Sequence, residues 1–177
     1  MDSTDIVISE TKESDLENVL TLWNDGDVMK YVGFPNGLGE KMDSMIRWFK
    51  WIEKNKPRVR HYSIYAGGLG YCGEAFYSID PAHGFRASLD IKLFSAARGK
   101  GIAARALSHA IDEAFENGAQ NVWVDPNPAN LKALALYEKL GFINKDMPDS
   151  LRGTEMSDVD FIPVYMEIDK EHWRARR

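Results

Sequence analysis

The sequence predicts an α/β fold with a mixed β-sheet, and three patterns along its 177 residues lead to this class. Strand patterns joined by short turns fill residues 59–93, which predicts antiparallel neighbours. Residues 101–117 place apolar side chains at helical spacing, and a strand pattern lies on each side of this helix. A strand, a helix and a further strand in this order form a right-handed parallel crossover. We therefore expect a mostly antiparallel sheet of about seven strands with about four helices on its faces.

The N-terminal part predicts one strand and two helices around an irregular segment. A short apolar run at 6–8 forms the strand, and Ser14 is the expected N-cap of a helix over 16–23. The stretch 26–39 is rich in Gly, Asn, Asp and aromatic residues, so we expect irregular structure there. A second helix is expected over 40–55, because its apolar residues form one stripe and a proline follows it.

The rest of the chain alternates strands with helices. Strands over 59–66 and 71–79 form a hairpin, and 87–93 alternates apolar with polar residues as a strand does. The helix over 101–117 is followed by a short strand over 121–125. The remaining elements are a helix over 130–140, a strand that starts at 142–143, a polar loop over 147–160 and a final strand over 161–168.

Length, charge and cysteine content narrow the class of protein. The length suits one compact unit, so we treat residues 1–177 as a single domain. No apolar run approaches the roughly 20 residues of a membrane span, and the acidic N-terminus lacks the features of a secretory signal. Cys72 is the only cysteine, which excludes an internal disulfide and fits a reducing, cytoplasmic location. The net charge of -5 argues against nucleic acid as a partner, and the basic tail 174–177 is expected to be a solvated end.

A glycine-rich segment opens the helix over 101–117. The unpaired N–H groups and the positive dipole end of a helix start bind anions. Gly99, Gly101 and the small Ala103 let a phosphate approach the backbone, while Arg98 and Lys100 add positive charge. The spacing matches neither a Walker loop nor a Rossmann fingerprint. Taken alone, the segment fits either a phosphate site or glycines that merely turn the chain.

A second group of residues shares one face of the helix over 130–140. Asn130, Ala133 and Tyr137 are spaced so that they line up along the helix, where they would form a slot for an extended ligand with a phenol at its far end. The alternative is a partly buried tyrosine that packs at a helix end. The neighbouring face is expected to pack on the core with Leu131, Leu134 and Ala135.

The two motifs together carry a resemblance to a known family. Arg98-Gly99-Lys100-Gly101-Ile102-Ala103, followed by Asn130-x-x-Ala133-x-x-x-Tyr137-Glu138-Lys139-Leu140-Gly141-Phe142, resembles the GCN5-related N-acetyltransferase (GNAT) superfamily. The order of predicted elements is also similar, and the resemblance covers nearly the whole chain.

The resemblance implies a cofactor site and a mechanism. Acetyl-CoA would be the co-substrate, with its acetyl and pantetheine part held by the backbone around Leu93 in a splay between two parallel strands. Backbone N–H groups from Gly99 through Ile102 to Ala104 would bind the pyrophosphate, and Asn130 would contact the pantetheine arm. Tyr137 would protonate the departing thiolate, since a phenol of pKa about 10 can supply a proton to a thiolate of about 8.5. The amine attacks the thioester directly, so Cys72 is expected to be a packing residue.

The acceptor side of the site rests on three carboxylates and one loop. An ammonium group must lose a proton before it attacks, and Asp90, Asp125 or Glu74 would take that proton. Either aspartate would equally serve to bind the ammonium group, and Asp125 has the alternative role of capping the turn before Asn130. The loop that contains Tyr31 is where the superfamily places its variable substrate-binding segment, although its aromatics would also suit a lid on the core. The four histidines show no metal-ligand spacing, so no metal is expected.

A narrower resemblance concerns residues 123–133. Asp125-Pro126, Pro128 and Asn130 are similar to aminoglycoside 6'-N-acetyltransferases, which also carry an aspartate where this chain has Asp90. Siderophore-lysine acetylases and enzymes that resemble ribosomal-protein acetylases share related spacing. The chain departs from the aminoglycoside pattern at Lys92 and in a shorter connection between Asp90 and Arg98.

Three functions follow from these patterns. The first is an N-acetyltransferase for a small cationic amine, such as an aminoglycoside, a polyamine or an amino acid. The second is a protein or peptide N-terminal acetyltransferase. The third is a non-catalytic acyl-CoA-binding module, which the presence of Tyr137 argues against. A small-molecule amine is the expected partner, with no membrane and no nucleic acid, and a homodimer is left open.

Overall fold

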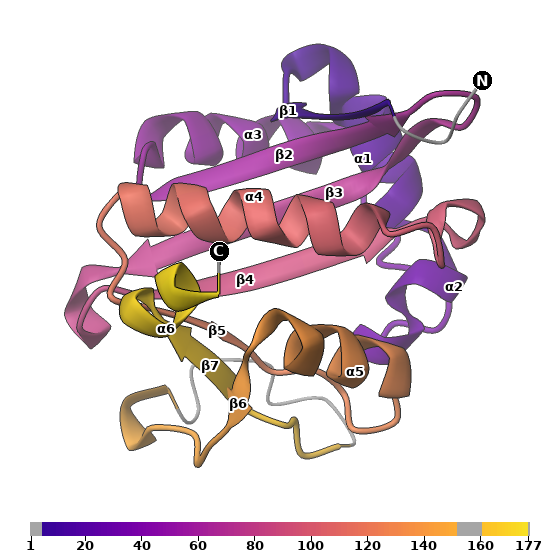
Figure 1. Cartoon of the computed structure of the whole chain (residues 1–177). Coiled ribbons are helices and arrows are strands. Elements are labelled where there is room, and N and C mark those ends of the chain that lie inside the picture. Colours follow the sequence, from indigo (N-terminus) through magenta and orange to yellow (C-terminus); the bar gives the residue numbers. More distant parts are fainter. Residues whose placement is uncertain (1–4, 152–160, 177) are drawn as a thin grey trace.

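The computed structural model describes residues 5–151 and 161–176, and their centre is one seven-stranded sheet (Figure 1). The strand order is β1-β2-β3-β4-β5-β7-β6. The strands are β1 (Ile6–Glu10), β2 (Val59–Ala66), β3 (Gly70–Asp80), β4 (Arg86–Leu93), β5 (Asn121–Val124), β6 (Ile143–Asn144) and β7 (Met166–Asp169). The helices are α1 (Leu16–Trp23), α2 (Gly26–Met29), α3 (Met42–Asn55), α4 (Ile102–Glu116), α5 (Leu131–Leu140) and α6 (Lys170–Ala175).

The pairing of the strands confirms the predicted mixed sheet. Strands β1 to β4 are antiparallel neighbours in chain order. The crossover through α4 makes β5 parallel to β4, and β7 then pairs antiparallel with both β5 and β6. The sheet is therefore mostly antiparallel, with one parallel pair at its centre.

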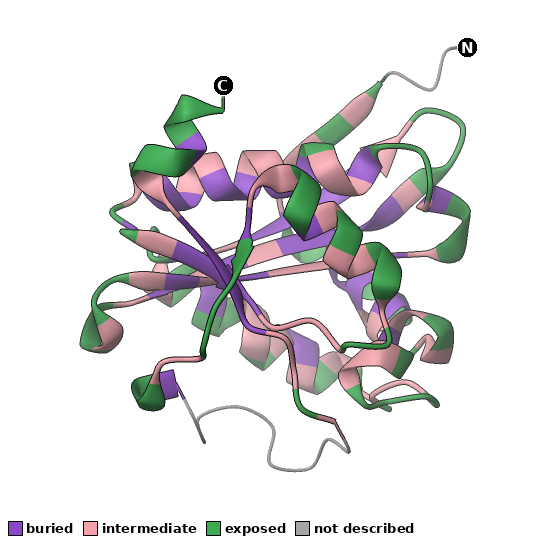
Figure 2. Cartoon of the chain, turned by 60° about the horizontal axis from the view of Figure 1, so that its bottom comes forward, coloured by how far each residue is buried: buried purple, intermediate pink, exposed green. Residues whose placement is uncertain are grey.

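Helices cover both faces of the sheet (Figure 1). Helix α4 packs on one face because its apolar stripe, which includes Leu107 and Ile111, is fully buried against β3 and β4. Tyr137 of α5 belongs to the same cluster of buried side chains. Helices α1 and α3 pack on the other face, against β3 and β2 respectively. Figure 2 shows the buried residues concentrated on the strands, with exposed residues on the outer side of α5.

Two segments differ from the prediction at the N-terminal side. The stretch expected to be irregular contains α2 and a 3-10 turn over Lys30–Val32, which Gly33 ends in a left-handed conformation. Asp25 starts α2 by accepting hydrogen bonds from two backbone N–H groups, so a local cap outweighs the glycine-rich composition. Ser14 is not the N-cap of α1, because it lies inside a 3-10 turn that precedes the helix.

The C-terminal end also differs from the prediction. The final strand is shorter than expected, and helix α6, which was not predicted, follows it and extends into the basic tail. Arg174, Ala175 and Arg176 are exposed, as expected of a solvated end. Asp169 caps α6 on the backbone N–H of His172, and Trp173 is buried with its Nε1 donating to Asp112 at 2.7 Å. One aromatic residue thus docks a segment whose other side chains are mostly polar. The predicted polar loop over 147–160 lies outside the described residues from 152 onward.

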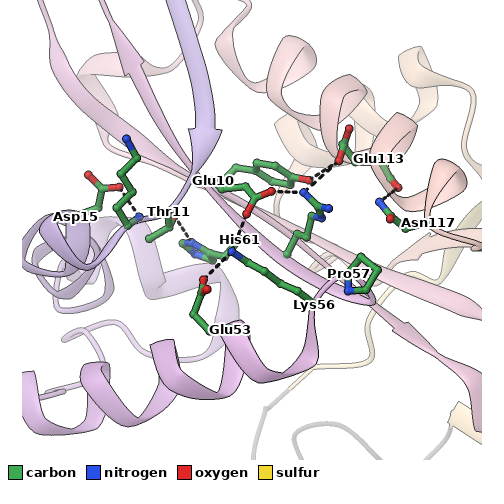
Figure 3. A network of polar contacts seen from close by, with 12 residues as sticks. Glu10, Thr11, Asp15, Glu53, Lys56, Pro57, His61, Glu113 and Asn117 are labelled. Atoms are coloured by element: carbon green, nitrogen blue, oxygen red, sulfur yellow. Dashed lines mark hydrogen bonds and ion pairs between the residues drawn. The ribbon is translucent and has the colours of Figure 1, made fainter.

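A network of ion pairs ties both helical layers to the edge of the sheet (Figure 3). The carboxylate of Glu10 on β1 forms ion pairs with Arg60 of β2 and with Lys56, which follows α3. The distance from Oε2 of Glu10 to Nζ of Lys56 is 2.7 Å. Arg60 also lies 3.6 Å from Glu113 of α4. These side chains are partly exposed, so each pair stabilises the fold by only about 0–1 kcal/mol. Their effect is mainly to fix where the helices meet the sheet.

Among the described residues, no helix is long and apolar enough to cross a membrane. No group of His, Cys, Asp and Glu side chains in that part of the chain is arranged to hold a metal ion.

Candidate active site

The central parallel pair of strands opens into a splay. Strands β4 and β5 pair only over Arg86↔Asn121, Ala87↔Val122 and Ser88↔Trp123. Strand β4 continues to Leu93, so its last five residues, Leu89 to Leu93, have no partner on β5. Backbone groups along such an edge can pair with an extended chain that carries amide groups. The splay expected from the family resemblance is present.

The start of α4 next to the splay is built to receive an anion. Gly101 is the N-cap, and no side chain caps the helix there. Gly99 and Gly101 have φ values of 74° and 78°, and an added Cβ at either would meet no atom within 4 Å. By helix geometry, the first N–H groups of α4, from Ile102 to Ala104, have no acceptor within the helix, and the positive end of the helix dipole lies there. Such a helix start can bind an anion such as a pyrophosphate.

Arg98 makes two contacts that the sequence did not predict. Its Nε donates to the Leu93 carbonyl at 3.0 Å, and its guanidinium also donates to Asp27 of α2 at 2.8 Å. The ion pairs with Lys30 and Arg98 lower the pKa of the Asp27 carboxyl. Arg98 thus joins the glycine-rich loop to the end of β4 and to the segment that contains Tyr31. Lys100, by contrast, is exposed.

Tyr137 is buried on the α4 side of the sheet. Its side chain is 6% exposed and packs against the ring of Phe142, with 5.6 Å between ring centroids. Burial, followed by the negative charges of Asp90 and Asp125, raises the pKa of the phenol. These two carboxylates therefore lie within electrostatic reach of Tyr137. The phenol keeps its proton throughout the neutral range and is available as a donor.

Asn130 starts α5 with its own side chain. Its Oδ1 accepts a hydrogen bond from the Ala133 N–H at 3.2 Å, which leaves the amide nitrogen for a ligand. Ala133 is half-buried and packs against the core. The prediction that Leu131 faces the core is wrong, since it is 72% exposed, and Ala135 is exposed as well. The inner face of α5 instead consists of Ala133, Leu134, Leu136, Tyr137 and Leu140.

Asp90 lies on the unpaired part of β4, on the face away from α4. Its side chain is 44% exposed. Its Oδ1 accepts from the backbone N–H of Ile91 at 2.8 Å, and its Oδ2 accepts from Lys92. Asp125 directly follows β5, on the other side of the splay. Each aspartate lies two residues beyond the last pair of the two strands, Ser88↔Trp123, so the two flank the same opening.

Glu74 is placed inside the protein instead of at the opening. It is 2% exposed, and both of its oxygens lie 2.9 Å from Nε1 of Trp23. His61 Nε2 lies 2.8 Å from Oε2. Burial alone would raise the pKa of Glu74, but the charges and hydrogen bonds around it lower that pKa to about 2. A carboxylate so fully engaged is a poor candidate for a proton acceptor.

Tyr31 lies in the 3-10 turn after α2, and its carbonyl accepts from Nδ2 of Asn127 at 3.3 Å. Asn127 belongs to the loop between β5 and α5, so the segment around Tyr31 adjoins the loop that leads to Asn130. Sequence reasoning missed Asn127 and the link from Arg98 to Asp27. The only available signal was the clustering of Asn and Asp around turns, which is too common to single out a pair.

Cys72 is buried on β3, and burial raises the pKa of its thiol. This agrees with its expected role as a packing residue, because nucleophilic cysteines have a lowered pKa.

Taken together, the splayed sheet, the uncapped helix start beside it and the buried phenol form a candidate site for a transferase that uses a nucleotide-linked acyl donor. Comparison with known proteins gives the family. Residues 5–143 match the model of the acetyltransferase (GNAT) domain, and the chain therefore belongs to the GNAT acetyltransferases. The predicted class, an acetyl-CoA-dependent N-acetyltransferase, is confirmed.

Solved structures show the same fold. A spermidine N-acetyltransferase from Vibrio cholerae, in complex with CoA and spermine, has a TM-score of 0.79 and 18% identity over 97% of this chain and 99% of that chain. An N-acetyltransferase from Staphylococcus aureus Mu50 has a TM-score of 0.74 and 21% identity over 94% and 99% of the two chains. A phosphinothricin acetyltransferase from Sinorhizobium meliloti, in complex with acetyl-CoA, has a TM-score of 0.74 and 20% identity over 93% and 88%. No curated protein sequence matches the chain.

Proposed function

We propose that this protein acetylates a primary amine of a small cationic molecule. Two observations support this proposal: Asp90 and Asp125 flank the opening of the splay, and the pKa of the buried Tyr137 phenol is raised by burial and then by the charges of these two carboxylates. A phenol that retains its proton and carboxylates that attract an ammonium group are the two polar functions this reaction requires. The acetyl group is supplied by the thioester of acetyl-CoA.

The cofactor side of the site is assigned to the backbone. The N–H groups of Gly99 to Ala104 would bind the pyrophosphate, and the unpaired edge of β4 near Leu93 would pair with the amides of the pantetheine arm. The amide nitrogen of Asn130 would add one hydrogen bond, and Ala133 leaves room beside it. These contacts would bring the thioester carbonyl to the opening between β4 and β5.

The acceptor side is assigned to Asp90 and Asp125, with Tyr31 at the rim. One carboxylate would accept a proton from the ammonium group, directly or through water, and the other would hold its charge. The freed amine would attack the thioester carbonyl, and Tyr137 would give its proton to the departing thiolate. Direct attack needs no protein nucleophile, in keeping with the buried Cys72.

The acceptor we favour is a polyamine, an aminoglycoside-like molecule or an amino acid. The net charge of -5 and the carboxylates of the site suit a cation, and the similar structures include acetyltransferases for spermidine and phosphinothricin. We further propose a single domain over residues 1–177 that acts in the cytoplasm without nucleic acid, with a homodimer as the assembly to test.

An amine panel tests this proposal. Purified protein with acetyl-CoA is offered spermidine, spermine, an aminoglycoside, free amino acids and an N-terminal peptide, and thiol release is followed. We expect turnover with at least one small cation and little with the peptide. Turnover only with the peptide would replace the small-molecule assignment by an N-terminal acetyltransferase. Binding without any turnover would favour a non-catalytic module, and an unchanged melting temperature at millimolar acetyl-CoA would refute cofactor binding itself.

A further inference from the structure

Lys92 is a buried lysine that the proposed chemistry leaves without a role. Its side chain is only 13% exposed, although it lies on β4 next to the opening of the sheet. An ammonium group loses its hydration on burial and needs charged partners in compensation. Buried ion pairs seldom add stability over apolar residues of similar size, so stability alone does not account for a lysine here.

Two carboxylates hold this ammonium group from either side. Glu74 is the partner of Lys92 in the register of β3 and β4, and Nζ lies 3.3 Å from Oε1 of Glu74. Nζ also donates to Oδ2 of Asp90, which lies two residues earlier on the same face of β4. Burial alone would lower the pKa of Lys92, but these two negative charges raise it. The lysine is therefore positively charged at neutral pH.

The inner carboxylate is fixed by the protein around it. Glu74 is held by Trp23 of α1 and by His61 of β2. His61 is held in turn by Thr11, whose Oγ1 lies 2.7 Å from Nδ1, a contact that Figure 3 shows. The ring of Trp48 also packs against His61 in a T-shaped arrangement, with 4.7 Å between the two ring centroids. Glu74 is thus a rigid anchor for the lysine.

The outer carboxylate is the one at the opening. Asp90 is 44% exposed, against 3% for the side chain of Glu74. Both oxygens of Asp90 have a defined partner, since Oδ1 takes the Ile91 N–H and Oδ2 takes Lys92. An exposed aspartate normally samples several rotamers, whereas this one is held in a single orientation by a buried cation.

We propose that Lys92 is a positioning residue, which Glu74 anchors and which fixes the carboxylate of Asp90 in the orientation that meets the acceptor amine. The inference rests on the proposed function of Asp90 at the acceptor side. It also gives the departure from the aminoglycoside pattern at this position a physical meaning, because the charge of Lys92 orients Asp90 through a contact within one strand.

The test is Lys92→Met, which keeps the length of the side chain and removes its charge. We expect kcat to fall by about tenfold or more, as a misplaced catalytic group does, while the KM for the amine does not rise because Asp90 remains negative. The dissociation constant of acetyl-CoA should stay within about threefold, since the cofactor contacts lie on the backbone. Lys92→Arg, which restores the charge, should recover part of the lost kcat.

Three comparisons make the test specific. Lys145→Met removes a lysine 2.7 Å from the buried Glu167 outside the site, and its kcat should be unchanged. Asp90→Asn with Lys92→Met should be no slower than Asp90→Asn alone, because the lysine acts only through the aspartate. A merely structural role for Lys92 would lower the melting temperature of Lys92→Met and leave its kcat intact at a permissive temperature. That result, or additive losses in the double variant, would overturn the inference.

A crystal structure of Lys92→Met separates this inference from the proposed function. The carboxylate of Asp90 should leave the Ile91 N–H or become disordered, whether or not an acceptor has been found. An unchanged Asp90 rotamer would refute positioning by Lys92. Absence of thiol release by the wild-type protein with every amine would instead refute the proposed function. If Lys92→Met does not fold, Lys92→Arg and Glu74→Gln answer the same structural question.

Discussion

At the scale of single residues, Tyr137 combines burial with two nearby negative charges, and both hold its proton in place. This makes the phenol a weak acid at rest. A thiolate that departs beside it changes the balance, because negative charge that develops on sulfur near two carboxylates is repelled, which raises the affinity of the sulfur for the proton of the phenol. The residue therefore contributes only at the moment when charge develops on the leaving group.

Tyr137→Phe is expected to lower kcat by about 100-fold, within the range for loss of a general acid. The ring still fills its place against Phe142, so the dissociation constant of acetyl-CoA should change by less than about threefold. Steady-state kinetics and calorimetric titration measure the two quantities. Equal turnover of the variant and the wild type would show that the thiolate leaves without this proton.

The variants Asp90→Asn and Asp125→Asn test which of the two carboxylates accepts the proton and which one binds the ammonium group. Replacement of the aspartate that accepts the proton by asparagine should lower kcat by about 100-fold or more. The residue that only binds the ammonium group should mainly raise the KM for the amine. Separate kcat and KM values for each variant decide the assignment. Wild-type kinetics in both variants would place the base elsewhere.

At the scale of elements, Gly101 has two roles at the start of α4. Gly101 has the left-handed φ of 78° that ends the loop, and it leaves the space beside it empty. Gly118, after the C-terminal end of the same helix, has a φ of 105° and is equally unobstructed. Both positions therefore need a positive φ, but only Gly101 lies at the start of the helix.

Gly101→Ala should weaken acetyl-CoA binding by about tenfold, because the new methyl group would occupy space assigned to the pyrophosphate and distort its N–H donors. Its cost in stability should be about 1–2 kcal/mol, the price of a left-handed alanine. Gly118→Ala should cost the same stability and leave cofactor binding unchanged. Titration calorimetry and urea unfolding of the pair test this, and equal cofactor affinity in both variants would contradict the assigned phosphate site.

Elements with strong periodicity could be predicted from sequence, and their long-range contacts could not. The alternation along β4 and the stripe of α4 follow from local spacing, so both elements appear within a residue or two of their expected bounds. The pair of Glu74 with Lys92 needs the register between two strands, which no local pattern supplies. Helix α6 was missed because only Trp173 packs in the core, and one residue makes no period.

The candidate site shows the same division. The glycine-rich loop and the helix face of Tyr137 are short motifs that can be recognised along the chain. The contact of Arg98 with Asp27 joins segments 71 positions apart, so no local pattern could show that this residue also links two loops. The orientation of Asp90 likewise depends on a partner whose own place is fixed by other strands.

At the scale of the whole molecule, Glu74 links stability to pH. Its pKa is lowered from 4.5 to about 2 in the folded protein, so the folded state binds its proton less readily than the unfolded chain does. The stabilisation is fully present above about pH 4.5 and is lost as the pH falls through about 2. A shift of this size corresponds to about 3 kcal/mol.

Glu74→Gln should remove this contribution to the acid unfolding of the protein. Urea unfolding at pH 7 and at pH 3 gives the free energy of unfolding at each pH for the wild type and the variant. The decrease from pH 7 to pH 3 should be smaller in the variant. Glu10→Gln, at a carboxylate with 38% side-chain exposure, should change the difference far less. A pH dependence identical to that of the wild type in Glu74→Gln would show that other carboxylates control acid unfolding.

The splay also has a mechanical consequence. The sheet has two parts, β1 to β4 on one side and β5, β7 and β6 on the other. Only three residue pairs between β4 and β5 join them, at Arg86 to Ser88 of β4. Helix α4 also links the two parts, because it packs against β3, β4 and β5. A ligand bound in the opening would add a further link, so occupancy of the site and stiffness of the whole protein would rise together.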